Sequence, residues 1–412
     1  MNLFFLMLEP LIYIGGGLLL YYKRDLAILY LPALFFASTA IVPTLPAIVE
    51  YFFFSSFIGF LIYKNPFFFS KNIFASLLFL LHILLIPGSS DLVLIRPSLF
   101  SVMWMLLLVP LAMTIIEKHT RMAVFKELSH SSIIILSIFI INVIFSTLFN
   151  YSPYEMYGIS SGILYGELIN TDFNILAVAT FVAFLLLTYK INPLHLLITL
   201  TSLLMIGLSM RRSVMGVCIL AFIFVLLILL MRRQTKQVIV ISTLIIFAGV
   251  CVGIFTDFSS IFQERFQQRN LGERELAGEA RFAEYAILYK DAFIHHDFNP
   301  WIGYELLNSS GNYGKGIFGD RSLHGDITNI IHSTGVIGLM LYLLMVGKCF
   351  LEAIKYSRLN TDRLIILFCL FTFIIFTVTG RYVQVSYMTL LFSLLCMPMG
   401  KIRRPSENLK TS

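Results

Sequence analysis

The chain alternates long runs of apolar residues with short polar segments along its whole length. Most runs hold about 17 to 22 residues, and a helix that rises 1.5 Å per residue then matches the ~30 Å hydrocarbon core of a membrane. We expect thirteen membrane-spanning helices, give or take one. They cover residues 3–22, 26–43, 46–63, 73–90, 97–116, 131–149, 173–189, 193–210, 213–231, 237–255, 326–347, 363–379 and 382–398. The first run lacks a preceding basic region and a small-residue cleavage site, which indicates a retained helix rather than a secretory signal.

Composition also indicates a membrane protein. Hydrophobic residues make up 58% of the 412 residues and charged residues 13%, which is more apolar side chain than a soluble protein of this length can bury. The five cysteines lie in or beside apolar runs without metal-ligand spacing. The sequence therefore predicts an all-α, polytopic membrane helix bundle of about 12–13 spans, with residues 1–412 forming a single membrane domain.

Lysine and arginine are concentrated in every second connecting segment. Nineteen of the 30 lie in one set, four in the opposite short loops and seven in residues 256–325. The rich set comprises 23–25, 64–72, 117–130, 190–192, 232–236, 348–363 and the tail from 401. By the positive-inside rule this set and the C-terminus are cytoplasmic, and 256–325 is one large periplasmic loop before the span at 326–347. Since the basic residues form no stripe with interleaved aromatics, nucleic acid is not an expected partner.

The large loop contains a candidate amphipathic helix. Apolar residues recur at spacings of three and four between Gly278 and His296, which is typical of a helix lying on the bilayer or on the tops of the spans. Its polar residues would then face water or a cleft. They are Arg281, Glu284, Lys290 and Asp291. The glycine-rich stretch at 309–320 predicts a flexible loop, and it lacks the context of a nucleotide-binding loop.

Two adjacent arginines, Arg211 and Arg212, lie in a turn on the side where basic residues are disfavoured. A lone arginine there is often explained by snorkelling to lipid phosphates. A pair also suits a lipid-linked pyrophosphate, because guanidinium groups hold phosphate oxygens bidentately and stay charged. No paired acidic motif or His/Cys cluster supplies a divalent ion, so we expect no metal and no cofactor.

His324 precedes the span at 326–347, on the side assigned to the periplasm. A histidine at a helix N-terminus is often only a polar interface residue. As a neutral imidazole it could instead take a proton from an attacking sugar hydroxyl. His295, His296 and His332 compete for that role, although His332 lies nearly two turns inside the span, where a structural hydrogen bond is the simpler expectation.

Three short motifs follow one another in a fixed order between residues 195 and 345. They are Arg211-Arg212-Ser213-Val214 before a span, Arg281 at the start of the amphipathic helix with Pro300-Trp301-Ile302-Gly303 after it, and His324 with Gly335 and Gly338 eleven and fourteen residues later. In this order and spacing the sequence resembles the bacterial O-antigen ligase and O-antigen polymerase superfamily. It departs from that pattern in having Arg211 where a serine is usual and Gly325 where an asparagine is usual.

The resemblance implies a metal-independent, GT-C-like glycosyltransferase of the bacterial cell inner membrane that acts on the periplasmic face. Its donor would be an oligosaccharide on undecaprenyl diphosphate, and its acceptor a sugar hydroxyl of a second lipid-linked repeat unit. Arg212 and Arg281 would bind the leaving pyrophosphate with support from Arg211. His324 would activate the acceptor, and Asp326, its possible substitute, and Arg321 are supporting residues. Such arginines would provide electrostatic catalysis.

Two alternatives stay open. A ligase would transfer the glycan to the lipid A core instead of to another repeat unit. A lipid-linked glycan flippase or other transporter would use the outer arginines only to line a path, although the predicted spans carry few of the charged residues that a transport path needs. Membrane lipid is an expected partner in each case, and a chain-length regulator is a further candidate partner for a polymerase.

Overall fold

A computed structural model of the protein describes residues 3–41, 43–149, 173–189, 192–209, 211–255, 280–317, 321–323, 325–380 and 382–402. Over these residues the fold consists of helices and turns without a strand, so the all-α fold class is confirmed there. Six of the described helices are long and apolar enough to cross a membrane, judged by length and composition. The total number of spans and the periplasmic position of the large loop remain predictions.

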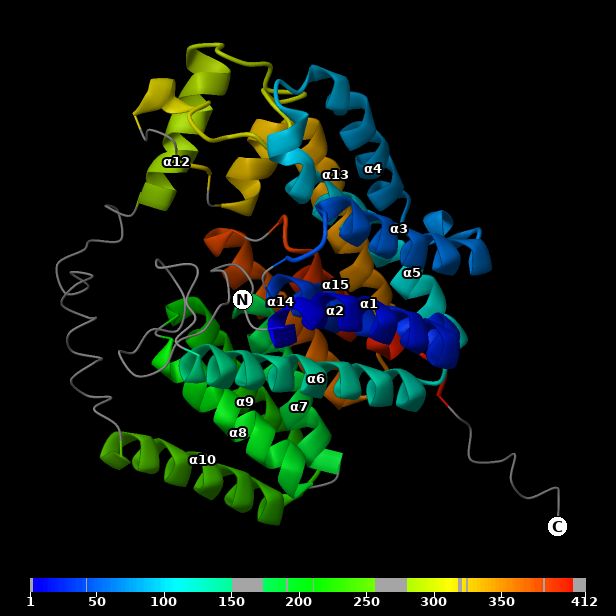
Figure 1. Ribbon diagram of the computed structural model, residues 1–412, viewed down its shortest axis with the longest axis vertical. Helices are drawn as coiled ribbons and strands as arrows, with labels where there is room; N and C mark the ends of the chain where they lie inside the picture. The colour runs from blue at the N-terminus through cyan, green and yellow to red at the C-terminus, as the bar shows by residue number, and fades with distance from the viewer. Residues whose placement is uncertain are drawn as a thin grey trace.

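From α1 to α6 and from α13 to α15 the helices follow one another with short connections, whereas 36 residues separate α12 from α13 (Figure 1). Their bounds are α1 Leu3–Lys23, α2 Leu31–Thr39, α3 Ala47–Lys64, α4 Ile73–Leu85, α5 Leu92–Lys118, α6 Arg121–Leu148, α7 Phe173–Tyr189, α8 Pro193–Leu208, α9 Arg212–Met231, α10 Thr235–Phe255, α12 Ala280–Tyr289, α13 Asp326–Tyr356, α14 Asn360–Thr379 and α15 Val385–Cys396. In Figure 1, α12 lies beside the first part of α13 at one edge of the molecule, and α10 lies at the opposite edge.

The centre of the bundle is built from α7 and α15. Every residue of α15 is buried, as is nearly every residue of α7. Phe181 of α7 stacks on Phe368 of α14 with the ring centroids 3.7 Å apart. Neither helix contains a charged side chain, as expected of helices that protein surrounds on all sides.

Three of the predicted spans are shorter in the structure than the apolar runs that suggested them. The runs at 26–43, 73–90 and 382–398 contain α2 of 9 residues, α4 of 13 and α15 of 12. A seven-residue 3-10 helix, Arg24–Tyr30, precedes α2, and three-residue 3-10 turns follow α4 and α15. A 12-residue helix rises about 18 Å, well short of the hydrocarbon core. An apolar run shows only that a segment avoids water, and in α2 and α15 the protein interior serves that purpose as well as lipid does.

The connecting segments of the lysine- and arginine-rich set meet at one end of the bundle. Ion pairs join four of its segments, and a backbone hydrogen bond of 3.0 Å from Arg121 to the carbonyl oxygen of Lys401 adds the segment after α15. The pairs are Lys23–Glu127, Lys71–Glu117 and Arg121–Asp362. The alternation of basic and non-basic loops therefore corresponds to the two ends of the folded chain, while the side of the membrane on which each end lies remains a prediction.

Candidate functional site

The amphipathic helix expected between Gly278 and His296 is present as α12, followed by one wider turn from Lys290 to Ile294. Lys290 is exposed, as expected. The expectation that Glu284 and Asp291 face water or a cleft is wrong, because these side chains are 0% and 4% exposed. Each carboxylate is buried against a partner within the loop.

Arg321 is the partner of Glu284. One guanidinium nitrogen lies 2.8 Å from the Glu284 carboxylate, and the Arg321 side chain is 30% exposed. Asp291 accepts a 2.7 Å hydrogen bond from the backbone N–H of Gly314. These contacts bind the segments after α12 to that helix. The ion pair of Arg321 therefore stabilises the fold of the loop.

The loop folds over a small apolar cluster of its own. We call the described loop residues 280–317 and 321–323 the cap. The buried cluster comprises Leu288, Ala292, Phe298, Tyr313 and Leu323, and Ile331 of α13 packs against it. The stretch predicted as a flexible loop is, in its described part, held by hydrogen bonds to Asp291 and from Leu323 N–H to the Ser309 hydroxyl at 3.0 Å. Glycine content alone does not reveal such tertiary anchors.

The Pro300–Gly303 segment of the cap is bound to a break in α13. At Gly335 the backbone leaves the helical conformation, with φ +67° and ψ −168°. The N–H groups of Val336 and Ile337 instead donate to the carbonyl oxygens of Pro300 and Trp301, at 2.9 and 3.2 Å. Backbone groups that the broken helix leaves unpaired are thereby satisfied by the cap, as a buried or lipid-adjacent backbone requires.

Two glycines allow this close approach. A Cβ atom on Gly335 would lie 2.3 Å from the carbonyl carbon and oxygen of Trp301. A Cβ atom on Gly303, whose φ is +85°, would lie 2.6 Å from the carbonyl oxygen of His332. The Pro-x-x-Gly motif and the glycine eleven residues after His324 are therefore the two halves of one interface, although in the sequence they are separate features.

His332 has the structural role expected of it. Its side chain is 0% exposed, and its Nε2 atom lies 3.2 Å from the carbonyl oxygen of Asn312 in the cap. Its own carbonyl oxygen accepts a 2.7 Å hydrogen bond from Tyr304 N–H. His295 and His296 are exposed at the end of α12. None of the three has a described contact with Asp326.

Glu305 ties the cap to the turn before α5. Its carboxylate accepts hydrogen bonds from the backbone and hydroxyl of Ser90, from Asn308 at 3.0 Å and from Asn312 at 3.0 Å. Burial raises the pKa of Glu305, but the hydrogen bonds from Ser90 and Asn308 outweigh this and hold it below its ordinary value. The ionised carboxylate therefore stabilises the attachment of the cap to the bundle.

Asp326 begins α13 and is 3% exposed. It accepts a 2.6 Å hydrogen bond from the backbone N–H of Tyr382, just before α15. The Tyr382 hydroxyl lies 2.8 Å from Nε2 of His82, whose Nδ1 lies 2.8 Å from the carbonyl oxygen of Leu78. Since a carbonyl only accepts, Nδ1 carries the proton and Nε2 accepts from the tyrosine. Asp326 thus begins a buried polar chain that links α13, α15 and α4.

His82 and Tyr382 are not among the residues expected from the sequence to matter for the site. A usable signal was present, because an ionisable residue inside an apolar run, as His82 is, generally pairs with another polar group or marks a functional position. Its partner could not be identified from the sequence, since 300 residues separate the two rings.

The start of α13 lies against α12. A Cβ atom on Gly325 would lie 3.4 Å from the hydroxyl oxygen of Tyr285. Burial, Asp326 and Glu284 together raise the pKa of that hydroxyl above its ordinary value. Arg281 precedes Tyr285 by one helical turn, and His324 is bonded to Gly325. The Arg281 side chain and His324 themselves lie outside the described residues, but a side chain at position 325 would touch the hydroxyl of Tyr285.

Arg211 and Arg212 lie at the start of α9. Arg212 is its first residue and is exposed, and the Arg211 guanidinium lies 5.1 Å from the ring centroid of Phe173 at the start of α7. Such a cation–π contact orients a guanidinium group without neutralising it.

The packing of α9 on α14 shows which end of the bundle carries these arginines. Phe224 and Phe368 meet with ring centroids 6.0 Å apart, and the end of α9 and the start of α14 line one hollow, so the helices are antiparallel. Arg212 precedes Phe224 by twelve residues and Gly380 follows Phe368 by twelve, about 18 Å in each case. Arg212 therefore lies at the level of Gly380, close in sequence to Tyr382, which binds Asp326. Arg212 and Asp326 belong to the same end of the bundle.

No model of a known protein family matches the chain, and no curated protein sequence matches it significantly. Among the described residues, no three His, Cys, Asp or Glu side chains gather as they would around a metal ion. The expected independence from metals and cofactors remains a prediction.

Proposed function

We propose that this protein is a polymerase of surface polysaccharide repeat units. It would transfer a glycan from undecaprenyl diphosphate to a sugar hydroxyl of a second lipid-linked repeat unit, on the periplasmic face of the bacterial inner membrane. The proposal rests on the resemblance of its motifs to those of the O-antigen ligase and polymerase superfamily.

The observation that carries this proposal is that motifs far apart in the sequence lie at one end of the bundle. The Pro300–Gly303 segment binds the break at Gly335, α12 contacts the start of α13, and Arg212 lies at the level of the Tyr382–Asp326 contact. Chance matches to three weak motifs would have no reason to lie at the same end of a bundle. A structure that separated them would have removed the support.

The proposed roles follow from the chemistry of a diphosphate leaving group. The acceptor hydroxyl attacks the anomeric carbon of the donor while the bond from that carbon to the diphosphate oxygen breaks. His324 takes the hydroxyl proton, with Asp326 as its possible substitute. Arg212 and Arg281, supported by Arg211, stabilise the charge that develops on the departing undecaprenyl diphosphate. The N-terminus of α9, where Arg212 lies, contributes the positive end of a helix dipole.

The test uses purified protein and a lipid-linked repeat unit. We expect a ladder of products without lipid A core, and its loss in Arg212→Ala, Arg281→Ala and His324→Ala variants that still insert and express. Arg212→Lys should also be poor because an ammonium group lacks the bidentate fork. Lys290→Ala is the matched control, since it removes an exposed cap cation outside the proposed site.

The outcomes separate the candidate functions. Strict dependence on lipid A core would indicate a ligase, and movement of the intact lipid-linked glycan without turnover would indicate a transporter. Normal ladders from the three alanine variants would refute the proposed site.

A further inference from the structure

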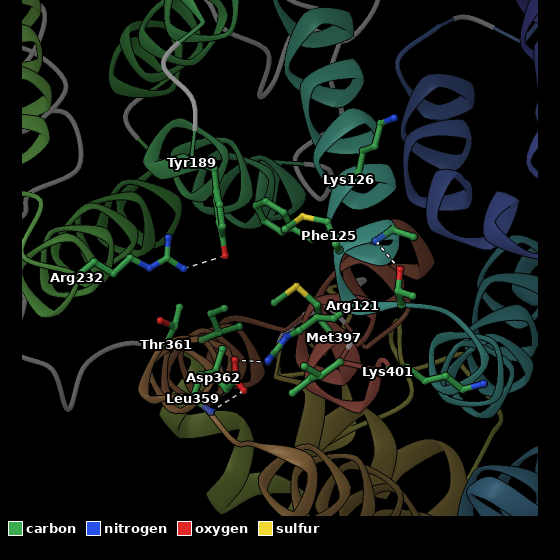
Figure 2. Close-up of a pocket in the computed structure, with 15 residues that line it drawn as sticks. Arg121, Phe125, Lys126, Tyr189, Arg232, Leu359, Thr361, Asp362, Met397 and Lys401 are labelled. Atoms are coloured by element: carbon green, nitrogen blue, oxygen red, sulfur yellow. Dashed lines mark hydrogen bonds and ion pairs between the residues drawn. The ribbon is translucent and has the colours of Figure 1, made fainter. Parts of the chain in front are cut away.

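A hollow of about 640 Å³ lies at the end of the bundle away from the cap (Figure 2). It is formed where α6 and α14 begin, where α7 and α9 end, and by the residues after α15. Its lining contains four basic side chains and one carboxylate: Arg121, Lys126, Arg232, Lys401 and Asp362. The length of α13 separates this hollow from the proposed catalytic end, so it requires an explanation of its own.

Arg232 is oriented across the hollow by neutral groups. Its guanidinium donates to the hydroxyl oxygens of Tyr189 at 2.8 Å and Thr188 at 3.3 Å, and lies 4.4 Å from the centroid of the Tyr189 ring. Among the described residues no carboxylate pairs with it. The guanidinium group is therefore held in a fixed orientation while its positive charge is not compensated. A group in this arrangement can bind an anion without first breaking an ion pair.

Arg121 faces the hollow from the other side, beside Asp362 (Figure 2). It forms an ion pair with one oxygen of Asp362, and the other oxygen of that carboxylate accepts backbone hydrogen bonds of 3.1 Å from Arg358 and Leu359. The Nη1 atom of Arg121 is buried and has no hydrogen-bond partner among the described residues. Asp362 therefore does not use all of the hydrogen-bonding capacity of the Arg121 guanidinium.

The rest of the lining is largely apolar. Met122 and Phe125 of α6, Ile365 of α14 and Met397 face the same hollow as the two guanidinium groups. In Figure 2 the amino groups of Lys126 and Lys401 point away from its centre, so they strengthen the positive field at the rim without contacting an occupant directly. The combination of guanidinium groups and apolar walls matches an amphiphile with an anionic head.

We propose that this hollow binds an anionic phospholipid, with the phosphate between Arg232 and Arg121 and an acyl chain along the apolar wall. The charge pattern assigns this end of the bundle to the cytoplasmic face, where basic pockets between spanning helices meet anionic head groups. The phosphate chemistry would also suit a soluble phosphate. A lipid fits better because the apolar walls gain nothing from an ion that has no apolar part.

The experiment is native mass spectrometry of the purified full-length protein with phosphatidylglycerol and phosphatidylcholine in equal amounts. We expect selective retention of phosphatidylglycerol, reduced roughly five- to tenfold in Arg232→Gln. Thr361→Trp, which fills the hollow without a change of charge, should also abolish retention. Lys236→Gln is the matched control, because it makes the same charge change at an exposed position of α10 that does not line the hollow. Thermal unfolding of each variant verifies that it folds.

Equal retention of phosphatidylglycerol by the wild type, Arg232→Gln and Thr361→Trp would overturn the proposal. So would thermal stabilisation by inorganic phosphate as large as that by phosphatidylglycerol vesicles, since that result would identify a soluble anion as the ligand. Loss of retention in Lys236→Gln to the same degree would show only nonspecific attraction to the basic surface and would also contradict the site.

Discussion

Gly303 and Gly335 are the residues whose identity matters most for the position of the cap. Both have positive φ, and both lie where another backbone segment leaves no room for a side chain. Their spacing in the sequence singles them out, but spacing does not show that the two segments touch. Their shared constraint is steric and therefore appears only when the two segments are brought together.

We expect Gly335→Ala to destabilise the protein by about 2 kcal/mol or more, because alanine is strained at φ +67° and its Cβ would collide with Trp301. Thermal unfolding in detergent measures this. Gly347→Ala, on the same helix with nothing within 4 Å of its new Cβ, should leave the unfolding temperature unchanged or slightly higher. An equal loss in both variants would contradict the steric explanation.

At the scale of elements, α12 shows what an amphipathic pattern can and cannot reveal. The spacing of apolar residues predicted the helix and its approximate bounds correctly. It assigned Glu284 and Asp291 to a polar face, whereas the structure buries both among cap segments that contribute their partners. The sequence of a single helix does not indicate which later segment of the chain will pack over it.

The Glu284–Arg321 pair permits a double-mutant test. Arg321→Leu alone should destabilise the cap by about 2 kcal/mol, because it leaves the carboxylate of Glu284 buried without this cation; a fully buried pair would cost more. Adding Glu284→Leu should restore much of the loss, since two apolar side chains need no partner. Limited proteolysis of the cap measures the effect, and a double variant as labile as Arg321→Leu would count against this view.

At the scale of the whole molecule, the two sets of loops that the charge pattern distinguishes lie at the two opposite ends of the folded bundle. The basic segments meet through ion pairs and the hollow around Arg121, whereas Arg212, Asp326 and the cap lie at the other end. This agreement follows from chain alternation, because each long helix returns the chain to the opposite end.

The sidedness of the membrane is testable with exposed positions at each end. In intact spheroplasts, a membrane-impermeant maleimide should label Lys290→Cys in the cap and should not label Lys236→Cys. The described native cysteines, Cys218, Cys349, Cys369 and Cys396, are buried and serve as the unlabelled background. Labelling of Lys236→Cys alone would invert the proposed topology.

The sequence by itself determined the helical fold of the residues that the structure describes, where most of these helices lie, and how the loops divide into two sets. These properties depend on local periodicity and on the high energetic cost of placing charge in an apolar medium, both of which are readable residue by residue. Only the tertiary structure decided that the runs containing α2 and α15 are protein core, that Glu284 and Asp291 are buried, and that Gly303 meets Gly335. Those outcomes depend on contacts between segments that are distant in the sequence. The polarity of a residue does not indicate which distant segment will pack against it.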